Sequence, residues 1–572
     1  MPPRIRPEAP ESLRPSALKD RLLLIAVLLI GAWLRIDVLT QAIRFHPDEA
    51  LFATFARDAA VHGQWMFPGA LDKPPLSLYA AALSMHGGGV FTNSKGVLDL
   101  DLPTGEFAAR LPSVWAGIVS IALTYTLART LTRRRDAALI AALLMALSPF
   151  HAAFSATAFT DPLMLACGLA SLVMAARGRP LWAGIWLALA VWSKQQGVFL
   201  LPLSLWLVMF SHRSCPTPKN PHLNPPPLTG EDFFAHSATQ YPSIPSVRAT
   251  DAPAVESKRD ELPTTDFYRR GEGVKFSFRS GGGLLVIQLL VAFLLGIGLL
   301  FVWDAVRAST FDAASLFTQA AVNNNPERAF VRADELLPRL EVWGAYLGTF
   351  FGSPLVTMAL LLAGLSGLRR VHWPLLVPLM VYSAVYLLAH WLVAFNLYDR
   401  YLLPVVPLLA VMVGAGLAQG MSALNRVCGR YNGHGSAVSL QVILMLLVAG
   451  VMLLSAYPPR YPTDDRPRDA GIIALADHLN DKPLGAILYD PWLGWELGYY
   501  LGPWTDKRRV HYPAPEVLAA DALLNPDTAP RYFIAPHDRD IRAWLAALES
   551  AGFAISSDWD SPRYVAFELI PP

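Results

Sequence analysis

The sequence predicts a mainly helical, polytopic membrane protein with a small α/β domain at its C-terminal end. Of its 572 residues, 53% are hydrophobic and only 16% are charged. The mean hydropathy of +0.35 is too high for an ordinary soluble protein. The net charge of +2 is distributed in short clusters at the ends of apolar runs and forms no basic face, so we expect no nucleic-acid partner.

Apolar segments long enough to be considered as membrane spans recur along most of the chain. A helix needs about 20 mostly apolar residues to cross a bilayer. About eleven segments, several of them short, are predicted as spans. They lie near residues 21–40, 109–131, 137–151, 159–176, 181–194, 197–211, 284–303, 343–366, 373–394, 401–419 and 438–456.

The positive charges of the short loops predict the orientation of these helices. Lys and Arg cluster before the first segment and in alternate loops after it, so the N-terminus (1–20) is expected in the cytoplasm and the C-terminus outside. Residues 212–283 are rich in Pro, Ser, Thr and charge, which predicts a disordered cytoplasmic linker. This linker divides the spans into a front half (21–211) and a back half (284–457).

The largest outer segments are the loop 41–107 and the tail 458–572. In the loop, acidic residues after Pro47, apolar residues at helical spacing and a stop at Gly63 predict an amphipathic helix lying on the membrane surface. The tail alternates short β-like runs (486–489, 531–534, 564–569) with helical stretches (467–479, 539–551), as a small α/β domain would. Its aromatic residues are interpreted as core or membrane-interface residues, with sugar stacking as the alternative. They are Trp492, Trp495, Tyr499, Tyr500 and Trp504.

Ionisable residues gather at the predicted outer ends of the helices. Asp48 and Glu49 follow the first span, and Lys73 follows some two dozen residues later. Placing ionisable side chains beside lipid costs free energy, so such residues usually have a functional role. They therefore indicate a site at the outer membrane face.

Five short motifs together resemble a known family. They are the Asp48-Glu49 pair, Lys73-Pro-Pro-Leu76, Ala109-Arg-Leu-Pro-Ser113, Thr160-Asp-Pro162 and Tyr398-Asp-Arg-Tyr-Leu-Leu-Pro404. The combination is similar to that of the protein O-mannosyltransferase and lipid A aminoarabinose-transferase group. These are GT-C membrane glycosyltransferases that use a polyprenyl-phosphate sugar as donor. The resemblance covers roughly residues 20–456.

The resemblance implies roles for several residues. Asp48 matches the catalytic acid, with Glu49 as its neighbour or partner, and Lys73 matches the lysine that binds the donor phosphate. Asp72 takes the position of a glutamate that is a metal ligand in the aminoarabinose transferases. His46 lies nearby in the sequence. Asp72 and His46 are therefore candidate ligands of a divalent metal ion, and no other cofactor is expected.

Further residues are assigned from their positions. Asp161 either faces Asp48 across the site or simply caps a helix. Lys194 and Arg400 either complete a phosphate clamp or are ordinary interfacial cations. Arg57 either pairs with Glu49 or reaches the phosphate.

The expected reaction is an inverting sugar transfer to a hydroxyl on the outer membrane face. One carboxylate suffices as general base, and the lipid-phosphate leaving group needs fixed positive charge and no general acid. Without an enzyme nucleophile, direct displacement inverts the anomeric carbon. The acceptor is a glycan, a lipid or a protein, and a bacterial inner (plasma) membrane is the expected location. The alternatives are a flippase or transporter for a lipid-linked saccharide and a polysaccharide polymerase or ligase.

Overall fold

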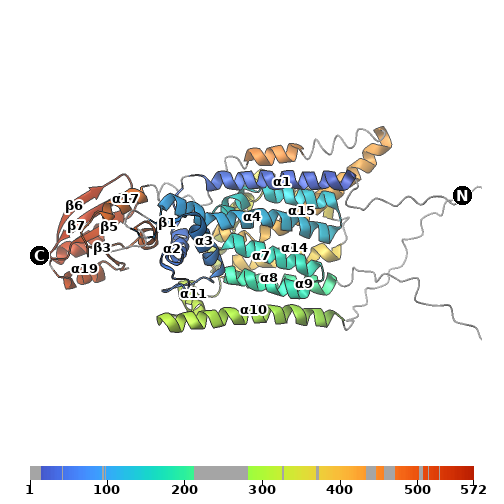
Figure 1. Cartoon of the computed structure of the whole chain (residues 1–572). Helices are drawn as coiled ribbons and strands as arrows, with labels where there is room; N and C mark the ends of the chain where they lie inside the picture. The colour runs from blue at the N-terminus through green and yellow to red at the C-terminus, as the bar shows by residue number, and fades with distance from the viewer. Residues whose placement is uncertain are drawn as a thin grey trace, which may run out of the picture.

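The computed structural model describes residues 15–41, 43–92, 96, 98–211, 281–324, 328–368, 373–432, 446–455, 471–501, 507–512, 514–526 and 528–572. Long helices form a bundle, shorter helices lie at one end of it, and a small α/β domain lies beyond them (Figure 1). The predicted fold class is confirmed. The predicted linker lies outside the described residues as far as residue 280, and the chain resumes at Gly281.

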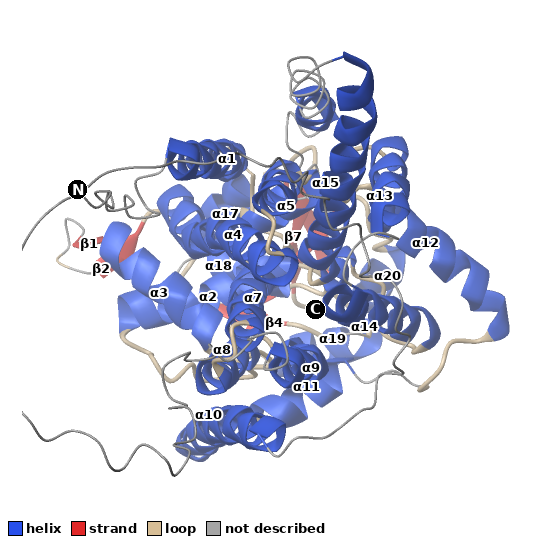
Figure 2. Cartoon of the chain, turned by 90° about the vertical axis from the view of Figure 1, so that its right-hand side faces the viewer, coloured by secondary structure: helices blue, strands red, loops and turns tan. Residues whose placement is uncertain are grey.

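The bundle is built from two groups of helices. Seen along its axis, α4 and α7 lie in the middle and α1, α10 and α13 at the periphery (Figure 2). The first group is α1 (Pro15–Leu39), α4 (Leu102–Thr132), α5 (Arg135–Leu147), α6 (Pro149–Ser155), α7 (Asp161–Ala176), α8 (Pro180–Ser193), η2 (Gln195–Leu200) and α9 (Leu201–Ser211). The second is α10 (Gly281–Phe311), α11 (Leu316–Asn324), η4 (Ala333–Glu335), α12 (Leu336–Gly348), α13 (Pro354–Leu368), α14 (Trp373–Leu392), η5 (Asp399–Leu402) and α15 (Val405–Asn432).

The number of spans stays a prediction. Among the described residues, four helices are long and apolar enough to cross a membrane, and the bent pair α5–α6 would make a fifth. Other predicted segments form apolar helices of 10–17 residues. The predicted span 343–366 is broken between α12 and α13, where Gly352 has a φ of +127°, a conformation that only glycine adopts readily.

The bend between α5 and α6 is 60° and has a local cause. Pro149 begins α6 and has no N–H to continue the ladder of α5. The carbonyl of Met145, which in a continuous helix would accept from residue 149, and the carbonyl of Ala146 accept hydrogen bonds of 3.1 Å from the buried Arg35 guanidinium. Arg35 thus fixes the bend from which the chain runs to the start of α7.

The first outer loop forms α2 (Pro47–His62), α3 (Leu76–Gly88) and an antiparallel pair, β1 (Val90–Thr92) with β2 (Leu98–Leu100). His46 and Glu49 form a capping box at the start of α2, and Gly63 ends the helix with a φ of +72°. The helix therefore begins and ends as the sequence predicts. It packs against α3 and a helix of the C-terminal domain, so protein covers faces that a helix on a membrane surface would expose.

The C-terminal domain is a five-stranded mixed sheet with helices. The strand order is β4-β3-β5-β7-β6, with β3 parallel to β4 and β5, and β7 antiparallel to β5 and β6. The central strand β5 is buried along its whole length, so it lacks the alternating pattern of a half-exposed strand. The elements are α17 (Ile472–Asn480), β3 (Ile487–Tyr489), α18 (Gly494–Tyr500), β4 (Arg508–Val510), α19 (Pro515–Leu524), β5 (Arg531–Pro536), α20 (Arg542–Ser550), β6 (Ala554–Asp560) and β7 (Tyr564–Ile570).

Asp490, which follows β3, makes the stability of this domain depend on pH. Burial raises its pKa to about 6, although the N–H groups of Leu493 and Trp492 donate to its Oδ1. The folded-state pKa lies above the unfolded value, so stability is highest below the unfolded pKa and falls as pH rises from about 4 to 6. At pH 7 the ionised carboxylate costs about 2–3 kcal/mol.

We therefore expect Asp490→Asn to stabilise the protein at pH 7, because the amide oxygen can accept both N–H bonds without a charge. Thermal melting of the purified protein should show an advantage that widens from pH 5 to pH 7. The exposed Asp477 of α17 provides the control, Asp477→Asn, which should melt as wild type does. A variant that is less stable than wild type at pH 7 would contradict the assignment.

Candidate active site

Five of the predicted residues meet at the end of the bundle next to α2. Arg400 Nη2 lies 2.5 Å from Asp48 Oδ2, and Lys194 Nζ lies 2.7 Å from Asp161 Oδ1. Lys73 is near enough to act electrostatically on both Asp48 and Lys194, and Arg400 on Asp161. The residues come from α2, the segment before α3, the start of α7, the end of α8, and η5.

Asp48 is the carboxylate of this cluster that reaches solvent. Its side chain is 35% exposed, whereas that of Asp161 is 2% exposed. Burial raises the pKa of Asp48, but the charges of Arg400, His46 and Lys73 outweigh this effect and hold the pKa below the usual value. Asp48 is therefore an anion at neutral pH, with an oxygen available to a substrate.

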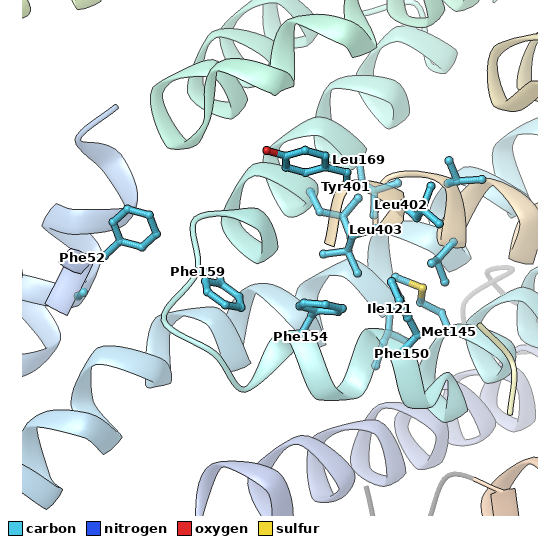
Figure 3. Close-up of a cluster of buried hydrophobic side chains, with 14 of the residues drawn as sticks. Phe52, Ile121, Met145, Phe150, Phe154, Phe159, Leu169, Tyr401, Leu402 and Leu403 are labelled. Carbon is cyan, nitrogen blue, oxygen red and sulfur yellow. The ribbon is translucent and has the colours of Figure 1, made fainter. Parts of the chain in front are cut away.

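Arg400 lies close to the faces of two aromatic rings. Its guanidinium lies 4.7 Å from the Phe159 ring centroid and 4.6 Å from that of Tyr398, a cation–π arrangement. Phe159 and the neighbouring Tyr401 belong to the apolar cluster under the site (Figure 3). These buried apolar side chains lower the local dielectric constant and so strengthen the electrostatic interactions of the charged groups next to them.

Asp161 and Lys194 form a buried ion pair. Asp161 is the first residue of α7, and Lys194 follows the last residue of α8. Lys194 Nζ also lies 4.9 Å from the centroid of Tyr401. The structure thus pairs Asp161 with a cation, which helix capping alone would not require.

Lys73 is held by its neighbours in sequence and by η2. Its Nζ lies 2.5 Å from Asp72 Oδ2, and the Gln195 side chain donates to the Asp72 carbonyl at 2.7 Å. Pro74 and Pro75 follow, and α3 begins only at Leu76. A proline disfavours helical backbone at the residue before it, so Lys73 lies in the non-helical segment that precedes α3.

The residues considered for a divalent metal do not fit one. No group of three His, Cys, Asp or Glu side chains that could hold a metal ion occurs in the part of the chain that the structure describes. Asp72 pairs with Lys73, and His46 Nδ1 accepts the N–H of Asp48 at 3.2 Å. Asp72 and His46 therefore bind other partners in the structure.

Glu49 is fully buried and holds the chain around Asp48 in place. Its two oxygens accept bidentate bonds from Arg110 Nε (2.9 Å) and Nη2 (3.0 Å). The backbone N–H groups of Ala158 and His46 donate to it at 2.7 and 3.1 Å. These bonds link the start of α2 to α4 and to the segment before α7. Because both carboxylate oxygens of Glu49 already accept hydrogen bonds, Glu49 is better suited to position the loop around Asp48 than to accept a proton from a substrate.

Arg57 lies elsewhere than the sequence predicts. Its Nη1 donates to the Tyr499 carbonyl at 2.5 Å and its Nη2 to the Leu100 carbonyl at 3.3 Å. The guanidinium is therefore directed to the contact between the first outer loop and the C-terminal domain. Arg110 takes the place at Glu49 that was predicted for Arg57.

Two site residues were missed by sequence reasoning although both lie in motifs that it singled out. Arg110 is an ionisable residue at the start of a long apolar helix, and such a residue signals a buried partner. Asp399 precedes Arg400, and burial raises its pKa to about 6. The negative charge of Asp161 contributes to this rise, so Asp399 is a further titratable carboxyl beside the cluster.

Comparisons with known proteins place the fold. Residues 100–224 match the family described as dolichyl-phosphate-mannose-protein mannosyltransferase. ArnT from Cupriavidus metallidurans bound to undecaprenyl phosphate superposes with a TM-score of 0.56 at 14% identity, covering 96% of this chain and 98% of that one. Its apo structure gives 0.56 at 15% identity, covering 97% and 98%. No curated protein matches the chain in sequence.

The fold is the GT-C fold of ArnT. Among the described residues, several helices are long and apolar enough to cross a membrane.

Proposed function

We propose that this protein is an inverting glycosyltransferase that moves a sugar from a polyprenyl-phosphate donor to a hydroxyl acceptor. The observation that carries the proposal is one partly exposed, ionised carboxylate, Asp48, among the three cations Arg400, Lys73 and Lys194. A lipid-phosphate donor needs this combination of one base and fixed positive charge. Undecaprenyl phosphate bound to ArnT supports a donor of this class.

In the proposed mechanism the donor phosphate competes with Asp48 for Arg400. The Arg400 fork suits phosphate oxygens, and Lys73 and Lys194 add point charges beside it. When the phosphate takes the N–H donors of Arg400, Asp48 loses its strongest positive neighbour and becomes more basic. It then accepts the proton of the acceptor hydroxyl, whose oxygen attacks the anomeric carbon while the bond to the phosphate oxygen breaks.

The test is transfer from a panel of radiolabelled polyprenyl-phosphate monosaccharides in native membranes. One donor should pass its label to a new product, and the sugar in that product should have the anomeric configuration opposite to that of the donor. Retained configuration would overturn direct displacement. If no donor is consumed but a labelled lipid-linked saccharide crosses the membrane, the protein is a transporter.

Replacing Lys73 should weaken use of the donor. Lys73→Ala removes a charge-assisted contact to phosphate, typically about 1.5–3 kcal/mol, and we expect kcat/KM for the donor to fall about 10- to 100-fold. Lys482 of the C-terminal domain also pairs with an aspartate, Asp558, at 2.6 Å, so Lys482→Ala is the matched control. Equal donor kinetics in the two variants would remove Lys73 from the phosphate site.

A further inference from the structure

The C-terminal domain extends two tyrosines of α18 into the helical bundle. Tyr499 and Tyr500 are 0% and 1% exposed and belong to the same apolar cluster as residues of the bundle. Strands β3, β5 and β7 contribute both to this cluster and to a second one within the C-terminal domain. We propose that Tyr500 is a positioning residue for Asp48, so that the C-terminal domain fixes the catalytic loop. This inference rests on the proposed function of Asp48.

Tyr500 holds the backbone just before α2. Its hydroxyl accepts the N–H of Phe45 at 2.7 Å and donates to the Glu106 carboxylate. Glu106 in turn lies 3.0 Å from Arg44. One phenol thus connects α18, the start of α4 and the segment that leads to Asp48.

Arg110 holds the same segment from the side of α4. Its Nη1 donates to the Ile43 carbonyl at 2.8 Å and its Nη2 to the Arg44 carbonyl at 3.1 Å, besides the bidentate pair with Glu49. The chain from residue 43 to residue 49 is therefore clamped between Arg110 and Tyr500. His46 N–H donates to Glu49, and Asp48 N–H donates to His46, so the clamp extends to the backbone of Asp48.

Tyr499 aligns the clamp. Its ring meets that of Phe45 edge-on at 4.8 Å, and its hydroxyl donates to the Leu102 carbonyl at 3.4 Å. A Cβ at Gly105 would lie 2.2 Å from this hydroxyl. A side chain at position 105 would therefore displace α18 from α4.

This arrangement predicts a loss of rate without a loss of donor binding. Tyr500→Phe keeps the ring in its pocket but leaves the Phe45 N–H and the Glu106 carboxylate without the hydroxyl. Because misplacing a reacting group by about 1 Å can cost about 100-fold in rate, we expect kcat to fall about 10- to 100-fold. The KM for the lipid donor should stay within about twofold, since Lys73 and Arg400 are not touched.

The matched control is Tyr489→Phe. Tyr489 is also buried in the C-terminal domain, but its hydroxyl bonds with Asp521 and Asn525 and not with the catalytic loop. Hydrogen–deuterium exchange of peptides covering residues 43–49, measured on the full protein, should accelerate in Tyr500→Phe and match wild type in Tyr489→Phe. This readout does not depend on activity.

A second pair of variants tests the contact without removing a polar group. Gly105→Ala should reproduce the kcat loss and the faster exchange, while Gly87→Ala in α3, where a Cβ would meet nothing within 4 Å, should not. Unchanged exchange at residues 43–49 in Tyr500→Phe, or unchanged kcat in an active protein, would overturn the proposal. If the wild type transfers no sugar, the proposed function fails, and the exchange comparison still decides whether Tyr500 holds the loop.

Discussion

Asp48→Asn is expected to lower kcat for sugar transfer about 10²- to 10⁴-fold, the usual contribution of a positioned general base. The amide keeps the shape and one oxygen of the carboxylate but cannot accept the acceptor's proton. Donor binding should persist, because Arg400, Lys73 and Lys194 all remain and one negative charge that competes with the phosphate is gone. Transfer kinetics with the donor identified from the panel measure both quantities.

The control for this variant is Asp58→Asn on the same helix. Asp58 lies 3.5 Å from His62 and, among the residues that the structure describes, forms no ion pair with a residue of the cluster. It should retain most of the wild-type rate. The pKa of Asp48 in the free protein is held below its usual value. Protonation of Asp48 should therefore not lower kcat/KM until the pH falls below about 4. An Asp48→Asn variant that transfers sugar as fast as wild type would rule Asp48 out as the base.

Glu49→Gln is expected to lower the free energy of unfolding by about 3–5 kcal/mol, because it removes the bidentate carboxylate partner of a buried arginine. Both side chains are at most 4% exposed, so water cannot replace the missing charge. Denaturant or thermal unfolding of the purified protein measures the change. The double variant Glu49→Gln/Arg110→Met, which removes both charges, should recover most of the lost stability.

The same experiment separates the two roles considered for Glu49. If Glu49 were the general base, Glu49→Gln would abolish transfer and Arg110→Met in the double variant would not restore it. If Glu49 positions the loop, activity should fall together with stability in Glu49→Gln. The double variant should then recover stability but not activity, because it also lacks the Arg110 bonds to the Ile43 and Arg44 carbonyls. A Glu49→Gln protein that is stable but inactive would instead make Glu49 the general base and Asp48 the positioning residue.

Much of the fold is visible in the sequence because it depends on local properties. Apolar length predicts the bundle helices, and the Pro47 start and Gly63 stop predict α2. Where the prediction differs from the structure, the reason is tertiary. The loop helix α2 is amphipathic whether its apolar face meets lipid or α18, so its pattern alone cannot distinguish these surroundings.

The site is less predictable because its ion pairs join distant segments. Asp48 and Arg400 could be chosen from their motifs, but no local pattern tells which arginine reaches Glu49. Arg57 and Arg110 are both arginines in helices, and only the packing of α4 beside α2 decides between them. For the same reason the buried pair of Asp161 with Lys194 is not apparent from a Thr-Asp-Pro motif that also suits a helix cap.

The long sequence separation of these contacts determines when the site can form during synthesis. Asp48 meets Arg400 across 352 residues, and Phe45 meets Tyr500 across 455. A ribosome that has inserted the first helices has therefore made the carboxylate but neither its cation nor the tyrosine that holds its loop. The nascent chain acquires the complete cluster only near the end of translation, and a truncated product stays in the membrane without a finished site.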